Sequence, residues 1–165
     1  MGLSLQQISD RIEVEDLLER YTSCIDAKDW DKLDTVFAAD AILDYSSSGG
    51  PPAGPYPEIK AWLQRALAIF PMTQHMIGKS RIAIEGDTAQ CRSIFYNPMG
   101  MPTDAEGNFT ADIAGRAGLH TFIVGGFYND TCHRRATSWG CRTDRRDHTT
   151  ASCRAPTRRA AARAT

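Results

Sequence analysis

Asp26 and His75 are residues whose types could form a proton-abstracting pair. Asp26 follows apolar Ile25, so its carboxylate is either a surface group at a helix end or points into the concavity of a sheet. His75 lies among the apolar residues of 72–77, a setting typical of a hydrogen-bonded core histidine. If its ring reached Asp26, the carboxylate would fix the tautomer and raise the basicity of the ring. Such a pair could remove a proton from carbon or oxygen.

Three tyrosines could donate a hydroxyl to a carbonyl or phenol: Tyr21, Tyr45 and Tyr96. Each equally fits an amphipathic core residue whose hydroxyl reaches water, and we favour that interpretation for Tyr96. His120 could line a pocket from a later strand or face solvent. The chain has no phosphate loop, zinc-ligand spacing or nucleophile elbow, so we expect no metal and no cofactor.

The N-terminal part must hold these residues on helices. Ser4 and Gln7 can form a capping box that starts a helix ending near Ala27. Its apolar positions have the three-to-four spacing of one buried face: Ile8, Ile12, Leu17, Leu18, Tyr21 and Ile25. Asp29 can cap a short second helix over 30–37, and residues 41–45 alternate as a strand does.

The later part predicts one more helix and then strands. After a Ser, Gly and Pro loop over 46–55, Pro57 suits the first turn of a helix to about Phe70. Strands are expected over 73–85, 89–97 and 120–129, with a long loop over 98–118. Helices followed by antiparallel strands indicate the α+β class, with helices on one face of a curved sheet.

Composition divides the chain near residue 130. Of the 165 residues, 42% are hydrophobic and 24% charged, which is ordinary for a globular domain. Residues 1–130 hold 10 Lys+Arg against 18 Asp+Glu, whereas residues 131–165 hold 9 Arg against 2 Asp. The second part contains no Leu, Ile, Val, Phe or Met, so it has little apolar surface to bury. We therefore expect a domain over 1–130 and an anomalous tail over 131–165.

The tail allows two explanations. Its Arg, Ala and Thr content is typical of a frame-shifted product of GC-rich DNA, which is our hypothesis. The alternative is a disordered basic arm that contacts nucleic acid, but the segment has few aromatic residues and no nucleic-acid-binding motif. We expect no nucleic-acid partner. The chain also lacks a signal-peptide pattern and a membrane-length apolar run, so we expect a cytoplasmic protein.

The segment Glu19–Leu33 resembles the opening of the SnoaL-like group of the nuclear transport factor 2-like superfamily. Asp44-Tyr45 and residues 73–78 are similar to scytalone dehydratase in particular. The resemblance, over about residues 5–130, implies a cone formed by a long curved sheet around helices, often in dimers or trimers. Most enzymes of this group, including dehydratases, polyketide cyclases, ketosteroid isomerases and a dehydrochlorinase, need no cofactor.

The resemblance also implies roles for residues. In the dehydratase and the dehydrochlorinase, an Asp of the first helix pairs with a strand His, at positions matching Asp26 and His75. In the dehydratase a tyrosine after the first strand polarises the substrate carbonyl, and Tyr45 matches it. Other positions depart towards apolar residues: Ile25, Met99, Phe122 and Val124. With Tyr21, Trp30 and His120, these four are expected to line the pocket.

Together these features predict a dehydratase or isomerase acting on a small apolar cyclic or aromatic carbonyl compound. His75 would be the general base, Asp26 would orient it, and Tyr45 would donate to the developing oxyanion. Two alternatives remain open. One is a non-catalytic ligand-binding or oligomerisation module of the same fold, and the other is a structural protein like the small subunit of a ring-hydroxylating dioxygenase.

Overall fold

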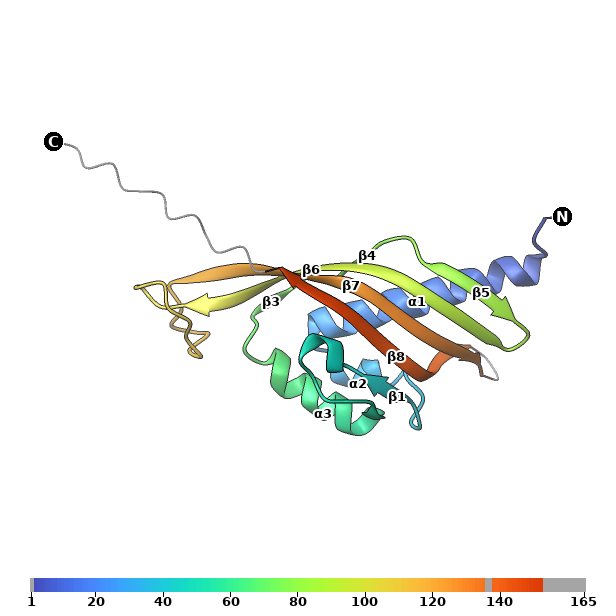
Figure 1. Cartoon of the computed structure of the whole chain (residues 1–165), viewed down its shortest axis with the longest axis horizontal. Helices are drawn as coiled ribbons and strands as arrows, with labels where there is room; N and C mark the ends of the chain where they lie inside the picture. Colours follow the sequence, from blue (N-terminus) through green and yellow to red (C-terminus); the bar gives the residue numbers. More distant parts are fainter. Residues whose placement is uncertain (1, 136–137, 153–165) are drawn as a thin grey trace.

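The computed structural model describes residues 2–135 and 138–152 of the chain. Three α-helices and a short 3-10 helix occupy the N-terminal part, and long strands follow (Figure 1). The helices are α1 (Leu5–Ala27), α2 (Trp30–Leu33), η1 (Ser46–Ser48) and α3 (Tyr56–Leu67). The strands are β1 (Ile42–Asp44), β2 (Gly54–Pro55), β3 (Met72–Thr73), β4 (Met76–Ile77), β5 (Arg81–Glu85), β6 (Thr88–Thr103), β7 (Gly118–Arg134) and β8 (Trp139–Ser152).

In the described part of the chain, one curled sheet holds all eight strands. Its order is β2-β1-β8-β7-β6-β3, and β4 and β5 pair with β6 as well. Every pairing is antiparallel except that of β1 with β8. The helices lie along one side of this sheet (Figure 1). The predicted α+β class, with a curved sheet packed on N-terminal helices, is confirmed.

Helix α1 begins and ends where its sequence predicts. Ser4 accepts from the Gln7 amide, and the Gln7 side chain accepts from the Ser4 amide, completing the capping box. At the other end Lys28 is left-handed, with φ 55°, which stops the helix. Ile8 and Ile12 are exposed rather than buried, because the first turns of α1 reach the end of the sheet (Figure 1).

The single strand predicted over residues 73–85 is interrupted. β3 and β4 share one register against β6, and between them the Gln74 amide still donates to the Pro98 carbonyl oxygen of β6 at 3.2 Å. The amide of His75, which in this register points away from β6, donates to the Asp26 carboxylate of α1 at 2.7 Å. A second interruption falls between Ile77 and Arg81, where the register shifts by one residue.

Strands β6 and β7 run further than predicted, into the expected loop over 98–118. They pair from Thr88↔His133 to Thr103↔Gly118. The loop is therefore shortened to the residues between Thr103 and Gly118, at a hairpin end that extends past the helices (Figure 1). Gly125 allows β7 to approach β6 closely, because a Cβ there would lie 3.3 Å from the Phe95 carbonyl oxygen.

The sheet continues beyond residue 130, where the composition changes. β7 ends at Arg134, and the backbone of β8 pairs with β7 on one side and with β1 on the other. Residues 153–165 of the predicted tail lie outside the described residues. The hypothesis of a separate origin for residues 131–165 stays a prediction.

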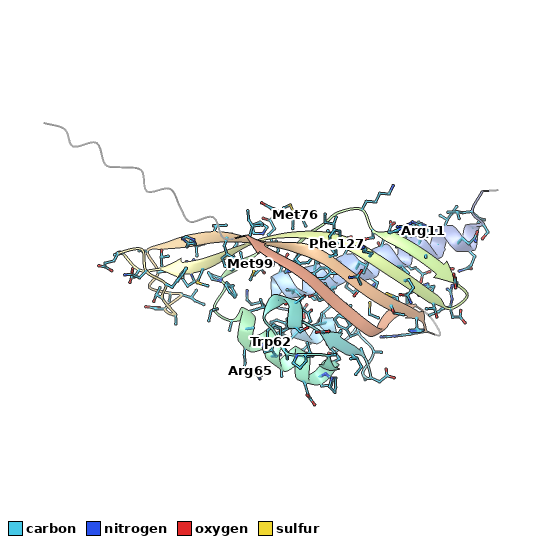
Figure 2. The ribbon with its side chains drawn as sticks, viewed as in Figure 1. Arg11, Trp62, Arg65, Met76, Met99 and Phe127 are labelled. Carbon is cyan, nitrogen blue, oxygen red and sulfur yellow. The ribbon has the colours of Figure 1, made fainter. Side chains whose placement is uncertain are left out.

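The core lies between the helices and the inner face of the sheet. Figure 2 shows Trp62 and Met99 between α3 and the sheet, whereas Met76 lies on the opposite side of the sheet. Met99 is 7% exposed and Met76 47%, which agrees with this division. Within the described residues, no helix combines the length and apolar character needed to cross a membrane.

Candidate functional site

Asp26 lies in the last turn of α1 and binds the interrupted strand through three hydrogen bonds. Its Oδ2 accepts from the His75 amide at 2.7 Å. Its Oδ1 accepts from the Thr73 hydroxyl at 2.9 Å and lies 2.6 Å from Nδ1 of the His75 ring. The carboxylate therefore holds both the backbone and the ring of His75.

The environment of Asp26 favours its ionised form. Burial acts to raise the pKa of this carboxyl, but the hydrogen bonds from His75 and Thr73 and the charge interaction with His75 outweigh it, so that the pKa lies below its ordinary value. The side chain of Asp26 is 25% exposed and that of His75 only 7%. A carboxylate that stays charged beside a buried imidazole can stabilise the imidazolium that forms on proton uptake.

The other ring nitrogen of His75 contacts Asn97. Nε2 of His75 lies 3.0 Å from Nδ2 of Asn97, a residue of β6. Oδ1 of Asn97 in turn accepts from the Gln74 amide at 3.0 Å. Both nitrogens of the ring are thus held, one by α1 and the other by β6.

The His75 ring forms part of the wall of an apolar chamber between α1, α3 and the sheet. This cavity has a volume of about 240 Å³. Most of its lining side chains are aromatic or aliphatic. They are Tyr21, Ile25, Tyr45, Ser48, Trp62, Leu63, Ala66, Leu67, Phe70, His75, Phe95, Asn97, Met99, Phe122, Val124 and Tyr128.

Two tyrosine hydroxyls meet at this chamber. The hydroxyls of Tyr21 on α1 and Tyr45, just after β1, are 2.7 Å apart. Both side chains are buried, and the Tyr45 ring packs against Trp62 at 5.5 Å between centroids. In this pair one hydroxyl donates to the other, and the accepting hydroxyl keeps a proton for another acceptor.

A second cavity, the polar groove, lies on the other side of the pair. It has a volume of about 600 Å³ and is lined by α1 residues, His75 and the segment 77–80. Asp26 lines the groove and is absent from the lining of the chamber, whereas His75 lines both. The imidazole therefore separates an apolar space from a polar one.

The structure brings most of the predicted site residues together. Seven predicted residues line the chamber: Tyr21, Ile25, Tyr45, His75, Met99, Phe122 and Val124. Trp30 does not, because it lies on α2 and packs against the core. His120 does not either, because it lies on the protruding hairpin, where its ring contacts Phe109. Tyr96 is 45% exposed and occupies an outward position of β6, so it is not the core residue that we favoured.

Asn97 is the polar residue of the site that the sequence interpretation missed. It is 3% exposed and lies on the inner face of β6, the same face as Phe95 and Ser93. A buried asparagine on the inner face of a predicted strand was the available signal. Among the described residues, no cluster of three or more His, Cys, Asp or Glu side chains could hold a metal ion.

A family model described as a SnoaL-like domain matches residues 6–146. Uncharacterized proteins of Mycobacterium tuberculosis and Mycobacterium bovis are 47% identical over 97 residues. That match covers 59% of this chain and 65% of each relative, so the chain spans somewhat less than two thirds of their length. The predicted family resemblance is confirmed.

Solved structures share the fold. A Kribbella flavida protein is 26% identical, with a TM-score of 0.70, and the match covers 88% of this chain and 92% of that one. A protein of Novosphingobium aromaticivorans titled a putative scytalone dehydratase is 16% identical, with a TM-score of 0.67 and coverage of 88% and 86%. A hexachlorocyclohexane dehydrochlorinase is 16% identical, with a TM-score of 0.68 and coverage of 90% and 93%.

Proposed function

This chain belongs to the SnoaL-like domain family, and we propose that it is a cofactor-independent lyase or isomerase. Its substrate would be a small, largely apolar cyclic or aromatic carbonyl compound. The observation that carries this proposal is the Asp26–His75 hydrogen bond of 2.6 Å at the wall of the apolar chamber. Two structural neighbours, described as a scytalone dehydratase and a dehydrochlorinase, agree with this reaction class.

The size of the chamber limits the substrate. An apolar cavity of about 150 Å³ takes up benzene, and sites for drug-sized ligands start at about 300 Å³. The chamber, at about 240 Å³, falls between these two values. We therefore propose a substrate of one ring or two fused rings.

In the proposed reaction, Nε2 of His75 takes a proton from the carbon next to the carbonyl group. The electron pair left behind forms an enolate. The Tyr45 hydroxyl, which is hydrogen-bonded to the Tyr21 hydroxyl, donates to the enolate oxygen. In a dehydration, the enolate expels a β-hydroxyl group, which receives the proton back from the imidazolium and leaves as water. In an isomerisation, the same proton returns to another carbon. Asp26 stays ionised and stabilises the imidazolium.

One observation favours a second candidate function. Nε2 of His75 already lies 3.0 Å from the Asn97 amide nitrogen, so the ring could serve only to hold the chamber wall. The protein would then bind an apolar ligand without converting it. The experiment below separates the two functions, because only the enzyme needs a proton acceptor at this position.

The test is to incubate the purified protein with one-ring and two-ring β-hydroxy ketones and follow water loss by the absorbance of the conjugated enone. We expect turnover by the native protein and at least about a hundredfold loss in His75→Gln, the usual scale for a general base. Glutamine can still hydrogen-bond to both neighbours but cannot accept the proton.

The matched control is His120→Gln, which changes a histidine outside the chamber and should retain full turnover. Ketones that bind in the chamber without losing water, with equal affinity for the native protein and His75→Gln, would favour the binding function. Turnover that survives in His75→Gln would refute the assigned base.

A further inference from the structure

Asn97, on β6, lies directly opposite His75 on the neighbouring segment of the sheet. The register shared by β3 and β4 against β6, extended through the interruption, pairs residue 75 with residue 97. Asn97 is 3% exposed, and its amide contacts the Gln74 backbone at one end and the His75 ring at the other. The Asn97 amide therefore links the Gln74 backbone to the His75 ring.

The Gln74 amide decides which way the Asn97 side chain is oriented. A backbone N–H can only donate, so the Asn97 atom that it meets at 3.0 Å must be the oxygen. The NH₂ group then faces Nε2 of His75, and Nε2 must be the accepting nitrogen without a proton. The neutral ring must accordingly carry its proton on Nδ1.

The contacts of Asp26 lead independently to the same tautomer. Its carboxylate accepts from the Thr73 hydroxyl and from the His75 amide. The remaining contact, 2.6 Å to Nδ1 of His75, is satisfied by a proton on Nδ1. Two separate hydrogen-bond chains, one from α1 and one from β6, thus specify the neutral Nδ1–H ring, in which the unprotonated Nε2 accepts from the Asn97 NH₂ group.

We propose that Asn97 is a positioning residue that makes Nε2 of His75 the proton acceptor and holds its electron pair at the chamber wall. The inference rests on the proposed function, since it specifies which atom of the base acts. When Nε2 gains a proton it becomes a donor, so the Asn97 NH₂ group must turn away. The Gln74 amide then keeps the Pro98 carbonyl oxygen, at 3.2 Å, as its acceptor.

The test compares two substitutions of Asn97. If Asn97 had only a structural role, both would change the modification rate of His75 in the same direction. Diethyl pyrocarbonate reacts with unprotonated imidazole nitrogen, and peptide mass mapping measures its rate at His75 alone. Asn97→Ala removes the donor, frees the electron pair, and should speed modification about fivefold, the equivalent of one ordinary hydrogen bond. Asn97→Asp has the same shape but only accepts, so it should hold a proton on Nε2 and slow modification at least fivefold.

Asn108→Ala and Asn108→Asp, in the exposed hairpin loop, are the matched controls and should leave the His75 rate unchanged. His120 provides an internal reference in every sample. Rates at His75 that move in the same direction in both Asn97 variants, or in neither, overturn the inference.

Long-range ¹H–¹⁵N spectra of the ring give a second readout, which applies even where reagent access is too slow. We expect Nδ1 protonated and Nε2 bare in the native protein, and Nε2 protonated in Asn97→Asp. A native ring protonated on Nε2 overturns the inference. Neither readout needs a substrate, so failure of the inference is distinguishable from a missing ketone activity, which would count against the proposed function alone.

Discussion

Replacement of Asp26 by asparagine removes a charge and leaves the volume of the side chain almost unchanged. In the native protein the two carboxylate oxygens accept from the His75 amide, the His75 ring and the Thr73 hydroxyl. Asparagine has one oxygen, so in either orientation of its amide the NH₂ group faces a position where a donor now lies. If it faces Nδ1 of His75, the ring must move its proton to Nε2, opposite the Asn97 NH₂ group.

The expected cost follows from these contacts. Loss of a hydrogen bond to a charged group costs about 1.5–3 kcal/mol. The single oxygen of the asparagine still accepts from some of the donors that contact Asp26. We therefore expect Asp26→Asn to lower the free energy of unfolding by about 2–3 kcal/mol. In a chain of this size, each kcal/mol lowers Tm by about 2–4 °C, so the melting temperature should fall by about 5–10 °C.

Denaturant unfolding and thermal melts at several pH values measure this effect. The pKa of Asp26 is lower in the folded protein than its ordinary value of 3.8. The contribution of the carboxylate is therefore complete above about pH 5 and is lost as the pH falls from there through the folded pKa. The stability gap between the native protein and Asp26→Asn should narrow over the same acidic range.

The matched control is Asp31→Asn, which changes an exposed carboxylate of α2. It should alter the free energy of unfolding by no more than about 0.5 kcal/mol. A stability for Asp26→Asn equal to that of Asp31→Asn, or a gap that persists unchanged to pH 2, would refute the reasoning.

Two further predictions concern the end of β7 and the wall of the chamber. Arg134→Ala removes the 2.7 Å ion pair with Asp10 and should lower Tm at neutral pH. The Arg134 hydrogen bond lowers the pKa of Asp10 to about 2. The difference in Tm between the native protein and the variant should therefore persist at pH 4 and vanish as the pH falls through 2, which thermal melts across that range would show. Gly50→Ala would place a Cβ 2.7 Å from the Trp62 ring and 2.8 Å from the Tyr45 Cβ, so it should displace the chamber wall. A tryptophan fluorescence titration should then show several-fold weaker binding of 2-naphthol, and an unchanged affinity would contradict this prediction.

Local signals allowed α1 to be predicted well. Its capping box, its length and the left-handed residue that ends it involve residues close in sequence. The exposure of Ile8 and Ile12 could not be predicted in the same way, because it depends on how far the sheet extends beside the helix.

The site depends on contacts between distant residues, and sequence spacing could not supply them. The Asp26–His75 contact joins positions 49 apart, and from spacing alone each residue also fitted a structural role. Only the family resemblance made them a pair. The backbone contact of His75, in the interruption between β3 and β4, is also long-range, because its acceptor is a carboxylate of α1. Asn97 was missed because its partners, Gln74 and His75, lie in that interruption.

The central claim is that His75 removes a carbon-bound proton inside the apolar chamber. Hydrogen–deuterium exchange at the carbon next to the carbonyl, followed by NMR in D₂O for one-ring and two-ring ketones without a leaving group, tests this step alone. We expect exchange faster than in buffer with the native protein and with His120→Gln, and exchange at the buffer rate with His75→Gln. Ketones that bind in the chamber yet exchange at the buffer rate with the native protein would contradict the claim.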